Sequence, residues 1–189
     1  FLFFIIVTRL LSDLRGALAR ERELARTDPL TALANTRAFT EMAIREIARA
    51  RRTGRPLALA CVDLNGFKKI NDELGHAAGD EMLVMVGTAL RSSTRKSDLP
   101  ARLGGDEFAI LLPETDEESV RTILDKVVDK VESYAVVEGR HASVSAGAVV
   151  SVSPPGLDEL LRAADRLMYD VKRSAEARSR IEILGPGPE

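Results

Sequence analysis

The pattern of apolar and polar positions divides the chain into helix-like and strand-like segments. Helical spacing of apolar residues predicts helices over 36–52, 67–74, 78–94, 117–134 and 157–174. Short apolar runs predict strands over 57–64, 101–103, 108–112, 142–152 and 181–184. Periodicity places Leu30, Leu33, Phe39 and Tyr169 in the core. This order predicts an α/β (α+β) sandwich, in which a central mixed sheet is flanked by helices and loops at strand ends carry the chemistry.

The first residues form an uninterrupted apolar run, Phe1 to Val7, and arginines follow it at positions 9, 15 and 20. Seven residues fall short of the roughly 20 that span a bilayer. Because arginines mark the cytoplasmic side of a membrane segment, the run is interpreted as the end of such a segment, with a cytoplasmic domain after it. The alternative is a hydrophobic helix end that packs on a partner.

A seven-residue apolar repeat follows between positions 4 and 25. Its a and d positions are Phe4, Val7, Leu11, Leu14, Leu18 and Ala25. The repeat predicts a short parallel coiled coil that pairs two chains, although a second register and Glu21 on the seam leave an amphipathic connector as an equal alternative. We therefore divide the chain into a signalling helix (1–27), one domain (28–185) and a tail (186–189).

The composition limits the kinds of partner that the chain is expected to bind and indicates the compartment that suits it. The chain has 27 Lys and Arg against 29 Asp and Glu, for a net charge of -2. Binding of a nucleic-acid polymer is not expected, because it requires a clear basic excess. The one cysteine, Cys61, lies within an apolar run and is expected to be buried, in keeping with a reducing compartment.

Two adjacent acids follow two glycines at the predicted hairpin tip, Gly104-Gly105-Asp106-Glu107-Phe108. Glycine lets the backbone approach a ligand closely. Neighbouring carboxylates at the end of a buried strand repel each other unless a cation compensates them. Asp63 ends the first strand, so pairing of the strands would add a third carboxylate. Oxygen ligands of this kind suit Mg²⁺, whereas the simpler interpretation is a polar hairpin turn.

The motifs together resemble the GGDEF family of diguanylate cyclases, from about Arg26 to Ile183. They are Asp28-Pro29-Leu30-Thr31, Asp63-Leu64-Asn65-Gly66-Phe67-Lys68-Lys69-Ile70-Asn71-Asp72, Gly75-His76-Ala77-Ala78-Gly79-Asp80, Arg102 to Phe108, Ser145-Ala146-Gly147 and Ala164-Asp165 with Tyr169 and Lys172. The resemblance implies a fold like the palm of polymerases and adenylyl cyclases. It also implies condensation of two GTP into cyclic di-GMP and pyrophosphate across a homodimer. The apolar run before the domain predicts attachment to the bacterial inner membrane through a segment ending near Val7.

The same resemblance assigns the catalytic and metal-binding residues. Asp63, the Leu64 carbonyl and Asp106 would hold Mg²⁺, or Mn²⁺ in its place. Glu107 would bind a second metal or help to activate the ribose 3′-hydroxyl. Lys172 would be catalytic and would contact phosphates. Two metals serve an in-line displacement of this kind by neutralising charge on the leaving group.

Substrate contacts are assigned by the resemblance in the same way. The backbone of Gly66, Phe67 and Lys68 would contact phosphates, beside Gly104 and Gly105 of the hairpin tip. Asn71 and Asp80 would bind the guanine edge, because a carboxylate accepts from its N1–H and 2-amino groups together. Asn71 could otherwise cap a helix, and Asp80 is also suited to a first helical turn.

Arg95 and Asp98 match the spacing of the family's inhibitory site for its own product, with a weak surface ion pair as the alternative. Three positions depart from the family pattern. Asn65 replaces a second aspartate, and Ala32 replaces a glycine. Glu176 stands where an arginine is usual, unless Arg178 serves instead.

Two other functions fit these residues less well. A cyclic di-GMP receptor without activity would bind through Arg95 and Asp98, but the acids that such receptors lack are present. A cyclase with a different nucleotide preference is disfavoured by Asp80.

Overall fold

The computed structural model describes residues 26–137, 143–174 and 178–184. The predicted membrane segment and coiled coil lie outside these residues. Within them the central element is a six-stranded sheet of order β1-β3-β4-β2-β5-β6. The strands are β1 (Ala34–Asn35), β2 (Leu57–Leu64), β3 (Leu99–Gly104), β4 (Glu107–Pro113), β5 (Val144–Ser151) and β6 (Ser179–Ile183).

The sheet is mixed, as predicted. Its middle strand β2 is antiparallel to both β4 and β5, and β3 and β4 form an antiparallel hairpin. The outer pairs, β1 with β3 and β5 with β6, are parallel. The strand β1 is absent from the sequence prediction, because two residues are too few to show a period of two.

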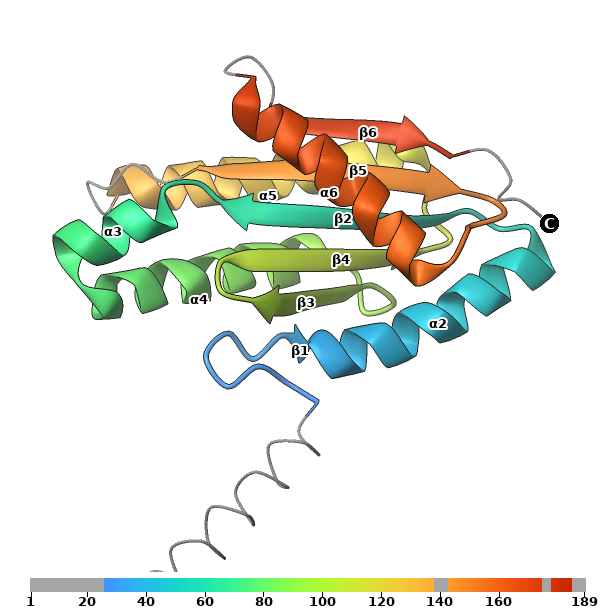
Figure 1. Ribbon diagram of the computed structural model, residues 1–189, viewed down its shortest axis with the longest axis horizontal. Helices are drawn as coiled ribbons and strands as arrows, with labels where there is room; N and C mark the ends of the chain where they lie inside the picture. The colour runs from blue at the N-terminus through green and yellow to red at the C-terminus, as the bar shows by residue number, and fades with distance from the viewer. Residues whose placement is uncertain (1–25, 138–142, 175–177, 185–189) are drawn as a thin grey trace, which may run out of the picture.

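Helices cover both faces of the sheet (Figure 1). They are α2 (Thr36–Thr53), α3 (Phe67–Leu74), α4 (His76–Ser93), α5 (Glu117–Val137) and α6 (Leu157–Arg173). The helices α3, α4 and α5 share one apolar core with one face of the sheet, whereas α2 and α6 share a second core with the other face. The predicted sandwich is therefore confirmed within the described residues.

Alternation along β2 decides which face carries Asp63. Every residue of β2 is buried, because layers of helices cover the sheet on both sides. Ala60 and Val62 belong to the core beneath α3, α4 and α5, and Cys61 belongs to the core beneath α2 and α6. Since side chains alternate, Asp63 lies on the same face as Cys61, which is the face that α6 crosses.

One core prediction was wrong and another was only partly right. Tyr169 is 56% exposed. The buried stripe of α6 is formed by Leu160, Ala164, Leu167, Met168 and Val171. Leu30 is half-buried at the margin of its core, whereas Leu33 and Phe39 are fully buried as predicted. No helix among the described residues is both long and apolar enough to cross a membrane.

Candidate active site at one end of the sheet

The acids predicted to act together do meet at one end of the sheet, where β2 ends and the β3–β4 hairpin turns (Figure 1). Asp63 lies directly opposite Glu107 in the register of β2 and β4. The Leu64 N–H donates to the Asp106 carbonyl at 3.3 Å, so the hairpin tip is fixed against the end of β2. The pairing that the sequence suggested therefore exists.

Lys172 reaches this carboxylate pair from the last turn of α6. Its Nζ lies 2.5 Å from Asp63 Oδ2, and the two side chains are 43% and 9% exposed, respectively. Burial raises the pKa of Asp63, and the hydrogen bond and charge of Lys172 offset this only in part. The same hydrogen bond raises the pKa of Lys172. The end of the sheet thus already binds one cationic group.

The donors at this end suit Mg²⁺ when it is shared with a substrate. Asp63, the Leu64 carbonyl, Asp106 and Glu107 offer only oxygen atoms, which hard divalent cations prefer. Among the described residues, no group of three or more acidic, histidine or cysteine side chains converges as a metal cage. Since Mg²⁺ is commonly bound by one or two carboxylates plus substrate phosphates, the set fits a metal that arrives with a triphosphate.

The loop after β2 exposes backbone N–H groups beside the carboxylates. Gly66 precedes α3 with φ of 73°, a left-handed conformation that favours glycine, and nothing lies within 4 Å of an added Cβ. Lys68 is exposed and Phe67 is half-buried in the first turn of α3. The first N–H groups of a helix lack intrahelical partners and can bind anionic groups.

Asn71 and Asp80 both lie near the junction of α3 and α4. An added Cβ at Gly79 would lie 2.0 Å from Asn71 Oδ1, so the Asn71 amide packs directly on the residue before Asp80. Asn71 lies inside α3 rather than at its N-terminus, which removes the helix-capping alternative. Asp80 is exposed and lies four residues after the start of α4, where its carboxylate is accessible to a ligand.

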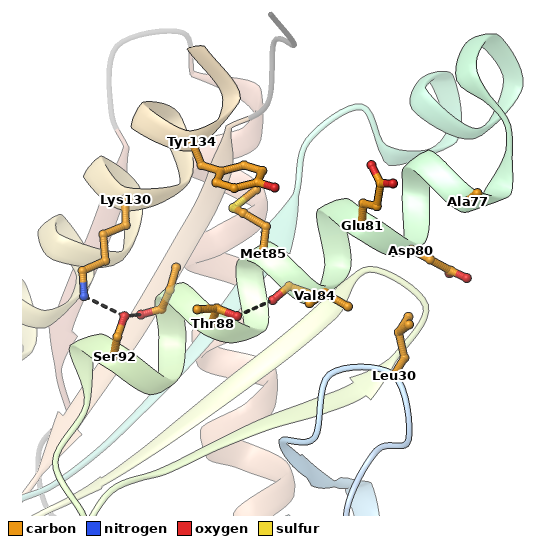
Figure 2. A pocket seen from close by; sticks show the side chains of 11 residues that line it. Leu30, Ala77, Asp80, Glu81, Val84, Met85, Thr88, Ser92, Lys130 and Tyr134 are labelled. Atoms are coloured by element: carbon orange, nitrogen blue, oxygen red, sulfur yellow. Dashed lines mark hydrogen bonds between the residues drawn. The ribbon is translucent and has the colours of Figure 1, made fainter. Parts of the chain in front are cut away.

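A groove of about 600 Å³ runs along α4 from this junction. Figure 2 shows Asp80 and Leu30 toward one end, and Lys130 and Ser92 toward the other, where the Lys130 Nζ donates to the Ser92 hydroxyl at 2.7 Å. Leu30 thus offers an apolar surface beside the Asp80 carboxylate, which is a suitable setting for a planar base.

Sequence reasoning assigned no role to Arg102 and Asp28, which connect the hairpin tip to the start of the domain. The Arg102 guanidinium donates to the Gly105 carbonyl at 2.7 and 3.0 Å and to both Asp28 carboxylate oxygens at 3.3 Å. Burial opposes ionisation of Asp28, but the hydrogen bonds from Thr31 and the charge of Arg102 outweigh it and lower the pKa of Asp28. The Gly-Gly turn is therefore braced by a charged pair.

Arg95 and Asp98 lie together, but not as an ion pair. The buried Asp98 carboxylate accepts from the Arg95 backbone N–H at 2.8 Å and from the Ser97 hydroxyl at 3.1 Å. The Arg95 side chain is exposed and borders a hollow of about 300 Å³ with Arg91 and Lys96. A surface salt bridge between the two residues is thus not what the structure describes, and the hollow is lined by cations.

Arg178, the candidate replacement for the missing arginine, forms ion pairs with α5. Its guanidinium pairs with Asp129 at 2.9 Å and Glu132 at 2.8 Å, both on α5. The helix α5 covers the face opposite to the one that α6 and Lys172 cross. In this conformation Lys172 is therefore the cation that contacts Asp63.

Known proteins match this chain over the residues that carry these motifs. The model of the family described as "Diguanylate cyclase, GGDEF domain" matches residues 25–178. The chain is 37% identical over 166 residues to the diguanylate cyclase DgcP of Pseudomonas aeruginosa, covering 86% of this chain and 24% of that protein. It is 36% identical over 169 residues to the cyclic di-GMP phosphodiesterase NbdA of the same organism, covering 88% of this chain and 22% of that protein.

The chain thus spans about a quarter of the length of these curated relatives. Among solved structures, the coiled coil and GGDEF domain of DgcB from Caulobacter crescentus, in complex with c-di-GMP, superimposes with a TM-score of 0.76. That match has 27% sequence identity and covers 95% of this chain and 97% of the other. Fold, motif order and family match agree, and the chain belongs to the GGDEF domain family of diguanylate cyclases.

Proposed function

We propose that this domain condenses two GTP molecules into cyclic di-GMP and pyrophosphate, each of two identical domains supplying half of the reacting assembly. The observation that carries the proposal is the pairing of Asp63 with Glu107, beside Asp106, at an open end of the sheet where Lys172 contacts Asp63. Family membership supports it independently.

In this proposal the hairpin tip and the end of β2 bind the triphosphate. Asp63, the Leu64 carbonyl and Asp106 would hold Mg²⁺, which would neutralise charge on the phosphates and lower the pKa of the attacking hydroxyl. Glu107 faces the ribose 3′-hydroxyl and accepts its proton or orients it. The backbone N–H groups at Gly66 and after it bind phosphate oxygens.

Lys172 changes partner as the substrate binds. Without nucleotide its ammonium neutralises Asp63, which is too buried to remain charged alone without cost. A divalent cation held by Asp63, the Leu64 carbonyl and Asp106 would supply that neutralisation in place of Lys172. The ammonium group is then released to the phosphates, where its charge offsets the negative charge that builds up on pyrophosphate as it leaves.

Asn71 and Asp80 select guanine. The Asp80 carboxylate accepts from N1–H and the 2-amino group, the Asn71 amide lies against Gly79 beside it, and Leu30 covers the base from the groove. Adenine lacks that pair of donors, so an adenine base could not make these two hydrogen bonds to Asp80. This supports GTP as the substrate.

The direct test is incubation of the purified protein with GTP and Mg²⁺, with separation of the products by chromatography and mass spectrometry. Cyclic di-GMP should form at a rate that rises with the square of protein concentration while the domain is mostly monomeric. Glu107→Gln should abolish turnover, whereas Glu118→Gln on the exposed face of α5 should not change it. A dimeric sample that binds GTP and makes no product would contradict the proposal.

Product inhibition through Arg95 and Asp98 is the second part of the proposal. The cation-lined hollow beside Asp98 supports it, since it offers Arg95 and Lys96 to phosphate or guanine acceptors. Added cyclic di-GMP should slow turnover, and Arg95→Ala should remove that inhibition without lowering the uninhibited rate. Equal inhibition of both proteins would contradict the assignment. Tight cyclic di-GMP binding without turnover would instead indicate a receptor.

A further inference from the structure

The side chain of Asn65 bridges Ser143, which directly precedes β5, and Ser145 of β5, next to the proposed metal site. Its Nδ2 donates to the Ser143 hydroxyl at 3.0 Å, and its Oδ1 accepts from the Ser145 hydroxyl at 3.0 Å. Ser145 is buried and lies directly opposite Asp63 in the register of β2 and β5. The amide group thus uses both its donor and its acceptor on the segment that flanks the metal-binding carboxylate.

The backbone of Asn65 is fixed by the same segment. Its N–H donates to the Ser143 carbonyl at 2.9 Å. Because a trans peptide is planar, with its N–H and C=O antiparallel, the Leu64 carbonyl of that peptide points away from β5. It points toward the β4 side, where the Leu64 N–H already meets the Asp106 carbonyl. The backbone hydrogen bond from Asn65 to Ser143 therefore sets the direction of the Leu64 carbonyl, and the two side-chain hydrogen bonds that Asn65 shares with Ser143 and Ser145 hold Asn65 in place.

We propose that Asn65 is a positioning residue, which locks the Leu64 carbonyl toward the hairpin tip as a metal ligand through its bridge to Ser143 and Ser145. This role rests on the proposed function, because it presumes that the end of the sheet binds a divalent cation together with GTP. Groups that orient metal ligands typically change metal affinity by about 10- to 100-fold when removed.

The test measures metal affinity directly rather than turnover. Mn²⁺ is titrated by electron paramagnetic resonance into the full chain with a non-hydrolysable GTP analogue. Asn65→Ala should weaken Mn²⁺ binding by about 10-fold or more. Asn65→Asp should restore wild-type affinity or exceed it, because its carboxylate can accept from both serine hydroxyls and its charge favours a cation. Thr122→Ala, at an exposed hydroxyl on α5, is the matched control and should leave affinity unchanged.

The outcomes separate this role from the function on which it rests. If wild type binds no analogue, the proposed function and this role both fail. If wild type binds it and a folded Asn65→Ala protein keeps the same Mn²⁺ affinity, the role alone fails. Should Asn65→Ala not fold, Ser143→Ala removes one of the two side-chain bonds, and an unchanged affinity in that variant overturns the proposal.

Discussion

Gly147 shows how closely α6 approaches the sheet. It lies in β5 opposite Cys61, on the face that α6 crosses. An added Cβ would lie 2.2 Å from the Met168 backbone nitrogen and 2.3 Å from the Ala164 carbonyl oxygen. Ordinary contacts at such a carbon are about 3.4–4 Å, and the obstructing atoms are helix backbone that cannot rotate aside. Gly147→Ala therefore requires α6 to move away from β5 by about 1 Å or more.

Two costs follow from that movement. Overpacking of a filled core typically lowers the free energy of unfolding by about 1–3 kcal/mol, and rigid backbone on both sides places Gly147→Ala near the upper end. For a chain of this size, about 2–4 °C of Tm is lost per kcal/mol, which gives a fall of about 5–10 °C. The shift also moves Lys172, one turn beyond Met168, away from Asp63. A displacement of about 1 Å at a reacting group can lower kcat about 100-fold.

Gly156→Ala is the matched control. Gly156 has φ of -63° and nothing within 4 Å of an added Cβ, so alanine fits there at the start of α6. Thermal unfolding by circular dichroism and GTP turnover at about 25 °C measure both effects in both variants. If Gly147→Ala unfolds within about 1 °C of Gly156→Ala and turns over GTP at the same rate, the inference that α6 is held rigidly on β5 is wrong.

Three further predictions concern single side chains. Asp63→Asn should abolish turnover yet raise the Tm of the nucleotide-free protein, because a buried carboxylate with a raised pKa favours the folded state only while it is protonated. Its stabilising contribution is therefore present at acidic pH and is lost as pH rises through the raised pKa, so the gain over wild type should shrink toward about pH 4. A Tm equal to that of wild type at about pH 8 would contradict this. Burial raises the pKa of Cys61 to about 12, so a thiol reagent at about pH 8 should modify Cys61 only after denaturation. Rapid labelling of Cys61 in the folded protein would refute this prediction. Ala32 has φ of 54°, a strained conformation for any residue with a Cβ, so Ala32→Gly should stabilise by about 0.5–1 kcal/mol in urea unfolding. Ala163→Gly, inside α6, should instead destabilise by about 1 kcal/mol. If both substitutions changed the free energy of unfolding in the same direction, the argument would be contradicted.

Most of the secondary structure of this domain could be predicted from its sequence. A period of 3.6 residues identified the five described helices, and short apolar runs identified the longer strands, each within a few residues of its ends. These elements are long enough to bury an apolar face, so their own pattern reveals them. The strand β1 was missed because two residues carry no period, and it exists only because β3 offers it a partner.

The composition of the candidate site was also predictable in part. Asp63 lies one residue before the end of β2, and Asp106 precedes Glu107 at the start of β4, so antiparallel pairing of these strands was enough to bring the acids together. The family motifs pointed to Lys172, Asn71 and Asp80. Local sequence carries such information because motif residues sit at fixed offsets from the ends of their own elements.

Tertiary structure alone decided which groups meet across the sheet. Tyr169 was expected in the core, but it lies one residue, or about 100°, beyond the buried Met168 and so faces outward. Arg178 was a candidate for the triphosphate and instead pairs with two acids of α5.

The sequence by itself determined the elements, the family and the acids that end β2 and begin β4. Only the tertiary structure decided that Asn65 bridges Ser143 and Ser145, and that Gly147 must be small because α6 crosses it. The physical reason is the same in each case. The periodicity of a segment indicates which of its residues are buried. It does not indicate which residue of another element each one contacts, because the distance and register between two elements leave no mark on the local sequence.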